Sequence, residues 1–157
     1  MGYKHIAKSY NELHKEEQLK KVKLIIKELK IKNKKVLDIG CGTAFYSNLF
    51  KNYTGLDNCK EMLKLAKANV IFGKAENLPF PDKSFDFVIS ITAIHNFKNI
   101  KKAILEMKRL AKKKIVISVL KRSKKINYIK KLIKENFKVK EIEEDKDIIF
   151  ICSLRTT

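Results

Sequence analysis

Residues 34–44 constrain the fold of this chain more than any other stretch. They read Lys-Lys-Val-Leu-Asp-Ile-Gly-Cys-Gly-Thr-Ala, a mostly apolar run that ends in a glycine-rich turn. This pattern predicts a buried strand over 36–39 that runs into a tight loop, and we expect a helix over 45–51 to follow. A strand, a glycine loop and a helix in this order bind a nucleotide-like ligand at the carboxyl ends of parallel strands.

Helix and strand signals alternate along the rest of the chain. Ahead of the glycine loop, amphipathic helices are expected over 3–14 and 16–30. The expected strands are 36–39, 53–57, 70–73, 85–91, 115–120, 138–144 and 148–154, and the helices between them are 45–51, 60–68, 100–111 and 126–137. The last two strands are joined by a short turn, so they must be antiparallel. The pattern predicts an α/β fold, with a mostly parallel seven-stranded sheet, helices on both faces and a C-terminal antiparallel hairpin.

The surroundings of the glycine loop indicate the ligand class. A dinucleotide fingerprint needs a third glycine where Phe45 stands, and the Gly-Lys-Ser/Thr of a P-loop is missing. Asp38 would repel a pyrophosphate and instead suits a cationic ligand end, such as the ammonium of an amino acid. Asp57 ends the next strand, where a carboxylate accepts hydrogen bonds from both hydroxyls of a ribose. An amino-acid end and a ribose together indicate S-adenosylmethionine.

Four segments of the chain resemble the successive motifs of the class I S-adenosylmethionine-dependent methyltransferases. They are Val-Leu-Asp-Ile-Gly-Cys-Gly-Thr at 36–43, Gly-Leu-Asp-Asn at 55–58, Ala-Glu-Asn-Leu-Pro-Phe-Pro-Asp-Lys-Ser-Phe-Asp at 75–86 and Ala-Ile-His-Asn-Phe at 93–97. The chain is most similar to the branch that includes ubiquinone and menaquinone biosynthesis enzymes and some tRNA methyltransferases. The resemblance covers about residues 3–154 and implies a Rossmann-like fold with S-adenosylmethionine as the cofactor.

The resemblance also implies which residues bind the cofactor. Carried over by position, they are Asp38, Gly40, Cys41, Gly42, Asp57, Asn58, Ala75, Glu76, Ile91 and Tyr10. The glycine loop holds the methionine end, Asp57 takes the ribose, and Ala75 and Glu76 lie beside the adenine edge. The alternative for Asp38 and Asp57 is that they cap helices. Cys41 is interpreted as loop filler rather than as a nucleophile.

The acceptor side of the site is less specific in its signals. His95 follows the strand 85–91 and is the candidate general base, with capping or packing as the alternative. Tyr3, Tyr10 and His14 fall where the family has an N-terminal lid, or they pack on the sheet. There is no Asn/Asp-Pro-Pro-Tyr after the strand, which argues against methylation of an exocyclic amino group of a base by that route.

Two residues depart from the family pattern. Ala44 stands where the loop usually has a third glycine, and we expect the loop to form unless this position needs a positive φ. Lys74 stands where the family often has an acid that accepts a hydrogen bond from the adenine amino group, which a lysine cannot do. Backbone groups, Asn58 or Glu76 would then have to meet the adenine.

The charge distribution suggests a polyanionic partner. The chain carries a formal net charge of +19, and most of the excess lies in residues 1–35 and 101–140. A basic surface on one side of a protein favours nucleic acid. The leading hypothesis is therefore an RNA methyltransferase that holds tRNA or rRNA through helices 16–30, 100–111 and 121–137, with an activator subunit as a further expected partner. The alternatives are a small-molecule or lipid/quinone-precursor methyltransferase, and a non-catalytic cofactor-binding subunit. The lysines could also be plain solvated faces.

The remaining features set the context in which the chain works. We expect one methyltransferase domain over 1–157, with a helical lid over 1–30 and the Rossmann-like core over 35–154. No window has the length of a transmembrane helix and no signal peptide is apparent, so we expect a cytoplasmic protein. The three cysteines have no ligand-like spacing, so no metal is expected.

Overall fold

The computed structural model describes the backbone of residues 3–155 and the side chains of residues 15–155. The helices are α1 (Tyr3–Leu29), α2 (Lys60–Leu63), α3 (Ile100–Leu110) and α4 (Ile126–Asn136), with short 3₁₀ helices at Ser47–Leu49 and Ile94–Asn96. The strands are β1 (Lys35–Ile39), β2 (Asn52–Asp57), β3 (Val70–Phe72), β4 (Phe85–Ile91), β5 (Ala111–Leu120), β6 (Phe137–Glu144) and β7 (Asp147–Leu154).

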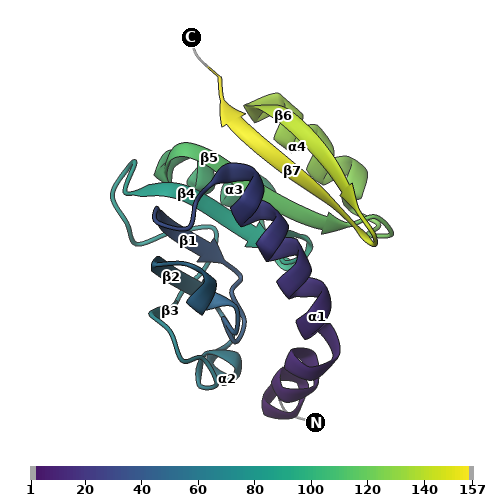
Figure 1. The fold of residues 1–157 in the computed structure, drawn as a ribbon. Coiled ribbons are helices and arrows are strands. Elements are labelled where there is room, and N and C mark those ends of the chain that lie inside the picture. The colour runs from purple at the N-terminus through teal and green to yellow at the C-terminus, as the bar shows by residue number, and fades with distance from the viewer. Residues whose placement is uncertain (1–2, 156–157) are drawn as a thin grey trace.

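All seven strands form one sheet in the order β3-β2-β1-β4-β5-β7-β6 (Figure 1). The first five strands pair in parallel, and β7 pairs antiparallel with both β5 and β6. The predicted mostly parallel sheet with its C-terminal antiparallel hairpin is therefore confirmed. This order places β1 and β4 in the centre, where the chain reverses its direction of progress across the sheet and a ligand crevice is expected.

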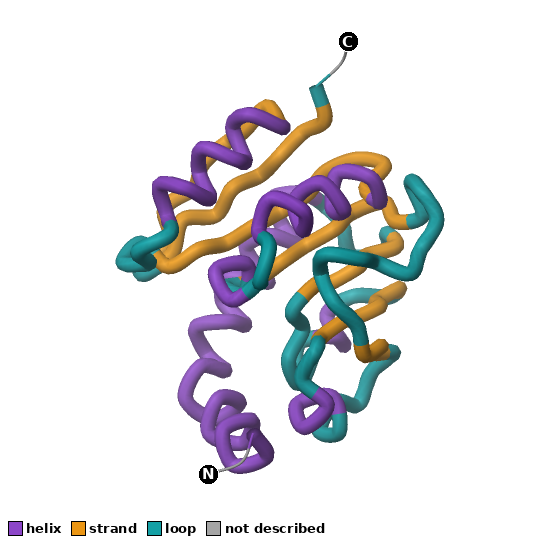
Figure 2. Tube along the Cα trace, turned by 180° about the vertical axis from the view of Figure 1, so that it is seen from behind, coloured by secondary structure: helices purple, strands orange, loops and turns teal. Residues whose placement is uncertain are grey.

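Helices cover both faces of the sheet, with α1 on one face and α3 and α4 on the other (Figures 1 and 2). Strand β5 shows why both faces are apolar: Ile115, Ile117 and Val119 pack beneath α3 and α4, whereas Val116 points to the α1 side. Alternate residues of a strand face opposite sides, so an uninterrupted apolar run is what a central parallel strand requires. Both cores consist of buried apolar side chains and position the loops at the carboxyl ends of the strands.

The helix expected over 45–51 is wrong, because only a 3₁₀ turn at Ser47–Leu49 forms there. Instead Tyr46 and Phe50 fold back as buried side chains, and their rings lie 6.5 and 5.7 Å from the ring of Tyr53. The connection from β1 to β2 also contains the glycine loop, so only a short helix could form in it. A short helix is marginally stable, because its few hydrogen bonds do not offset the free-energy cost of nucleation. Aromatic packing takes its place.

Two other helices differ from expectation in length. The helix expected over 60–68 ends at Leu63. Beyond it the chain makes turns with hydrogen bonds between residues three apart, such as the one from the Ala66 N–H to the Leu63 carbonyl. At the N-terminus, the two expected helices form the single helix α1, since no glycine or proline interrupts residues 3–29. The lid residues Tyr3, Tyr10 and His14 have side chains outside the described part of the chain.

The fold also bears on a membrane crossing and on a metal site. Within the described residues, no helix combines the length and apolarity that a membrane crossing requires. The same part of the chain holds no group of three or more His, Cys, Asp or Glu side chains arranged for a metal ion. The division into a lid and a core stays a prediction.

Candidate functional site

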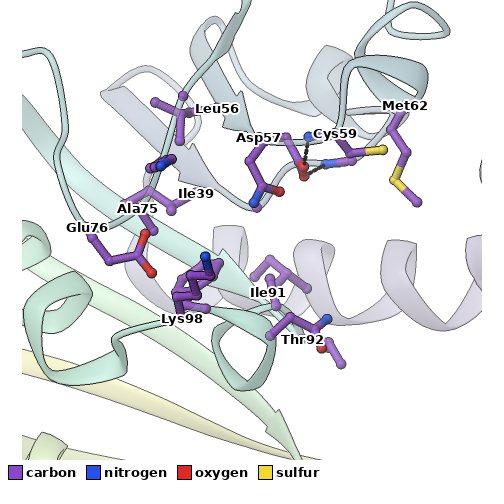
Figure 3. A pocket seen from close by; sticks show the side chains of 18 residues that line it. Ile39, Leu56, Asp57, Cys59, Met62, Ala75, Glu76, Ile91, Thr92 and Lys98 are labelled. Carbon is purple, nitrogen blue, oxygen red and sulfur yellow. Dashed lines mark hydrogen bonds between the residues drawn. The ribbon is translucent and has the colours of Figure 1, made fainter. Parts of the chain in front are cut away.

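A cavity of about 620 Å³ opens at the carboxyl ends of β1, β2 and β4 (Figure 3). Its wall is built from segments that follow β1, β2, β3 and β4 in turn. The lining residues are Ile39, Gly40, Gly42, Leu56, Asp57, Asn58, Cys59, Met62, Gly73, Lys74, Ala75, Glu76, Ile91, Thr92, Ala93, Asn96, Phe97 and Lys98. The size falls within the range of ligand and cofactor sites, and the position is the one at which open α/β sheets bind ligands.

The glycine loop forms the floor of the cavity and is tied to β2. The backbone N–H groups of Gly40 and Cys41 both donate to the Leu56 carbonyl, at 2.7 and 3.1 Å. Gly40 has a φ of +78°, and a Cβ there would lie 2.5 Å from the Cβ of Ala93. Only glycine fits at this position, because backbone conformation and space both exclude a side chain. Ala44 also adopts a positive φ, +51°, so the third-glycine position does need the conformation that favours glycine, and the loop forms with alanine held in it.

Asp57 joins the glycine loop to the start of α2. Its Oδ2 accepts a hydrogen bond from the Gly42 N–H at 2.8 Å, and its Oδ1 accepts one from the Cys59 N–H at 2.9 Å (Figure 3). A carboxylate oxygen can accept more than one hydrogen bond, so each oxygen keeps capacity for a ligand donor. The carboxylate is thus held in one orientation at the cavity wall.

Asp38 lies behind the glycine loop and does not line the cavity. It is fully buried, and the hydroxyls of Tyr46 and Tyr53 each donate to its Oδ2 at 2.6 Å. Burial raises the pKa of this carboxyl to about 6, although the two tyrosine hydroxyls oppose the rise. Within the described structure, Oδ1 has no hydrogen-bond partner. Cys41, beside it, has a buried thiol whose pKa is raised by burial, as befits a packing residue.

The segment after β4 forms the wall opposite Asp57. Thr92, Ala93 and Phe97 line the cavity there, and Thr92 has a φ of +51°. His95 is not among the lining residues. Its Nδ1 is buried without a hydrogen-bond partner in the described structure, and its carbonyl accepts from the Lys125 ammonium at 3.0 Å. Burial, aided by Lys125, lowers the pKa of His95, and its role as a base stays a prediction.

The third wall follows β3. Lys74 and Ala75 line the cavity there, with Lys74 exposed. The neighbouring Glu76 accepts a hydrogen bond from the Asn99 N–H at 3.0 Å, which leaves its second oxygen uncommitted among the described contacts. Lys98, at the end of the opposite segment, also reaches the cavity (Figure 3).

The structure brings together most of the cofactor residues expected from the sequence. Those that line the cavity are Gly40, Gly42, Asp57, Asn58, Ala75, Glu76 and Ile91. Asp38 and Cys41 lie behind the loop, and the Tyr10 side chain is outside the described residues. Residues absent from the expected set include Met62, Thr92 and Phe97. Met62 could have been predicted from the sequence, since it lies in the first helical turn after the strand that Asp57 ends and so faces the same crevice.

Comparison with known proteins places this fold and cavity in a family. The family model described as "Methyltransferase domain" matches residues 37–118, which span the glycine loop, Asp57 and the segment after β4.

Three curated relatives match parts of this chain at 32–39% sequence identity. MJ1252 of Methanocaldococcus jannaschii is 39% identical over 143 residues, covering 87% of this chain and 57% of that protein. The demethylmenaquinone methyltransferase of Thermotoga maritima is 34% identical over 97 residues, 55% of this chain and 42% of the enzyme. The phthiotriol/phenolphthiotriol dimycocerosates methyltransferase of Mycobacterium tuberculosis is 32% identical over 90 residues, 49% of this chain and 33% of the enzyme. The chain therefore spans only part of the length of these relatives.

Solved structures share the fold at low sequence identity. A SAM-dependent methyltransferase from Aquifex aeolicus superimposes with a TM-score of 0.80 at 20% identity, covering 97% of this chain and 98% of the other. A chain of the complex that contains the Haloferax volcanii Trm112 methyltransferase activator superimposes with a TM-score of 0.76 at 16% identity, covering 97% and 95%. At these identities the likeness establishes the fold alone.

Proposed function

This chain belongs to the class I S-adenosylmethionine-dependent methyltransferases, and from that membership we propose that it methylates a small-molecule acceptor, of the lipid or quinone-precursor kind. The observation that supports the cofactor site best is the Asp57 carboxylate. Backbone N–H groups fix it at the cavity wall, at the end of the strand next to the glycine loop. A carboxylate held in this way accepts hydrogen bonds from the two hydroxyls of a ribose.

The rest of the cavity fits the other parts of S-adenosylmethionine. Leu56, Met62 and Phe97 offer apolar surface to a flat base. Gly40 and Gly42 let the ligand approach the backbone of the loop closely. Asp38 lies behind this loop, fully buried, with its Oδ2 hydrogen-bonded to two tyrosines, so an ammonium could meet it only at its Oδ1, which is unpartnered among the described residues.

Lys74 determines how the adenine would be recognised. Its ammonium cannot accept a hydrogen bond from the base amino group, so another group must do so. Asn58 and Glu76 both line the cavity and carry acceptor oxygens. We assign the contact to one of these two residues or to backbone carbonyls beside them.

In methyl transfer the protein mainly positions the acceptor and the methyl donor relative to each other. The cofactor supplies a methyl group activated by its bond to a positively charged sulfur. The chain contributes the walls that orient the reacting groups and exclude water, with Ile91 and Ala93 apolar next to Thr92. A general base is required only where the acceptor must lose a proton, and among the residues that line the cavity none is a histidine.

The names of the relatives favour a small acceptor over RNA. Two of the quoted relatives are named for lipid or quinone acceptors. The basic helices, on which the RNA hypothesis was based, are also partly neutralised. In α4, Lys130 and Lys134 both pair with Glu141 of β6, at 3.2 and 3.6 Å. Exposed ion pairs of this kind lower the positive potential that a phosphate backbone would meet.

An activator subunit remains part of the proposal. It draws on the structural neighbour whose complex contains the Trm112 activator. Copurification of the chain with a second small protein, when expressed in its own cell, tests this directly.

Labelled-methyl transfer tests the proposed acceptor class. Purified protein is incubated with radiolabelled S-adenosylmethionine and the small-molecule, RNA and protein fractions of the source cell, with Asp57→Ala as the matched control. We expect label in the small-molecule fraction that the variant fails to incorporate. Label in RNA alone would instead support the hypothesis based on the basic helices.

A further inference from the structure

A buried polar cluster connects the N-terminal helix to the wall of the cavity. It consists of Lys21 of α1, Thr92 after β4, Ser118 of β5 and Asp147 at the start of β7. The Lys21 ammonium lies 2.9 Å from Asp147 Oδ2, with side-chain exposures of 7% and 5%. Few ion pairs are this buried, because the cost of removing both charges from water must be recovered by the contacts made.

Both charges converge on one hydroxyl. The Lys21 ammonium donates to Thr92 Oγ1 at 2.7 Å, and Thr92 Oγ1 donates to Asp147 Oδ2 at 2.8 Å. Ser118 Oγ lies 3.2 Å from Thr92 Oγ1 and accepts a hydrogen bond from the Thr92 N–H at 2.9 Å. The Thr92 hydroxyl is therefore occupied by the cluster and is not free to bind a ligand.

The backbone of Thr92 explains why such a cluster is present. Its φ of +51° is a left-handed conformation, which is strained for a β-branched residue. Thr92 lines the cavity, directly after Ile91 and before Ala93, whose Cβ lies against Gly40. Strain of this kind persists only where the surrounding contacts over-determine it, and it is concentrated at functional sites.

We propose that Lys21 and Asp147 are positioning residues that hold Thr92 in its left-handed conformation and so fix the cavity wall after β4 for S-adenosylmethionine. The inference rests on the proposed function, since it assigns both residues to cofactor binding although neither lines the cavity. It also makes the placement of α1 and the shape of the cavity dependent on each other. The N-terminal half of α1 projects past the carboxyl edge of the sheet, where the helix contacts α2 (Figure 1).

The surface ion pairs between α1 and the hairpin provide a matched control. Lys20 pairs with Glu144 at 3.5 Å, with the lysine side chain exposed. It occupies the neighbouring position of the same helix and bridges to the same hairpin, but no described contact joins it to Thr92. Exposed pairs contribute little to stability, so Lys20→Met removes a charge without disturbing the cavity.

Calorimetric titration with S-adenosylmethionine tests the proposal. For Lys21→Met we expect the Kd to rise about 5- to 30-fold, since the strained conformation must be restored on binding, whereas Lys20→Met changes it less than about twofold. The double variant Lys21→Met/Asp147→Leu replaces the ion pair by apolar side chains and leaves no buried charge unpaired, so it controls for weaker binding caused by unfolding. It is expected to weaken binding to the same extent with a cooperative melting transition intact.

A glycine at position 92 separates positioning from a merely structural role. Glycine adopts a positive φ freely, so Thr92→Gly is expected to make the Kd insensitive to Lys21→Met, within about threefold. A Kd that is the same in wild type and in Lys21→Met/Asp147→Leu would overturn the inference while leaving the proposed function intact. A wild-type protein that takes up no S-adenosylmethionine would instead overturn the proposed function.

Discussion

Replacing Asp38 by asparagine tests the energetics of the buried support behind the glycine loop. The carboxyl is fully buried, its Oδ2 accepts from the hydroxyls of Tyr46 and Tyr53, and the nearby charge of Asp57 further disfavours ionisation. The folded protein therefore resists ionisation of a group that ionises readily in the unfolded chain. The stability that this difference provides is fully present below the unfolded pKa and is lost as pH rises through the folded pKa.

The magnitude follows from the two pKa values. The pKa rises from 3.8 to about 6 on folding. At 1.36 kcal/mol per pKa unit, ionisation of Asp38 costs the folded state about 3 kcal/mol at neutral pH, most of it appearing between about pH 4 and pH 7. Asparagine cannot ionise. Any fixed cost of its amide is the same at each pH, so it adds a constant offset to the difference between the two pH profiles and leaves the pH dependence of that difference unchanged.

Urea denaturation from about pH 4 to pH 8 measures this difference. The free energy of unfolding of the wild type should fall by about 2–3 kcal/mol relative to Asp38→Asn over the interval. Tyr53→Phe removes one of the hydroxyls that favour the ionised form, so its profile should fall more steeply than that of the wild type. Parallel profiles for the wild type and Asp38→Asn, or a wild type that gains stability relative to the variant as pH rises, would refute the reasoning.

Three further predictions follow from single contacts. Gly40→Ala should destabilise the protein by at least about 2 kcal/mol in denaturant melts, since its Cβ would lie 2.5 Å from that of Ala93 and its φ is +78°. Adding Ala93→Gly to this variant should recover the part of the loss that comes from the steric clash. Full stability of Gly40→Ala would contradict the loop geometry. Arg109→Lys should make the loop 77–84 more susceptible to limited proteolysis, because the guanidinium donates hydrogen bonds to the Leu78 and Phe80 carbonyls and to the Asp82 carboxylate. Unchanged cleavage rates would count against that role. Phe150→Ala should lower the free energy of unfolding by about 3–5 kcal/mol, as the side chain is fully buried, and a loss below about 1 kcal/mol would indicate a looser core.

The sheet was predictable from the sequence because its signals are local. Most of the parallel strands contain an apolar run of their own, and the short connection at 145–146 forces the last two strands to be antiparallel. Asp57 could be predicted from its place at the end of the strand next to the glycine loop, because the carboxyl ends of parallel strands meet at one edge. The other cavity residues after β1, β2 and β3 were expected from the resemblance to the methyltransferase motifs.

Contacts between distant segments were beyond such reasoning. Asp38 precedes the glycine loop as expected, but it lies behind the loop and not in the cavity lining. One of the two tyrosines that bury it, Tyr46, depends on how residues 45–51 fold, and the expected helix there was wrong. Lys21 looked like one lysine among many on α1. Its partner Asp147 is 126 residues away, and nothing local distinguishes a lysine that will be buried from its exposed neighbours.

Calorimetric titration of S-adenosylmethionine into the wild type and Asp57→Ala is the most direct test of the proposed cofactor site. The Asp57 carboxylate is held at the cavity wall by the Gly42 and Cys59 N–H groups, so its loss would remove both of the hydrogen bonds that we propose it accepts from the ribose. We expect the wild type to bind and Asp57→Ala to bind at least about 30-fold more weakly. Asp86 does not line the cavity and accepts a hydrogen bond from the Lys35 N–H, so Asp86→Ala is expected to match the wild type. Equal affinity of the wild type and Asp57→Ala, or no binding by either, would contradict the assignment of this cavity to S-adenosylmethionine.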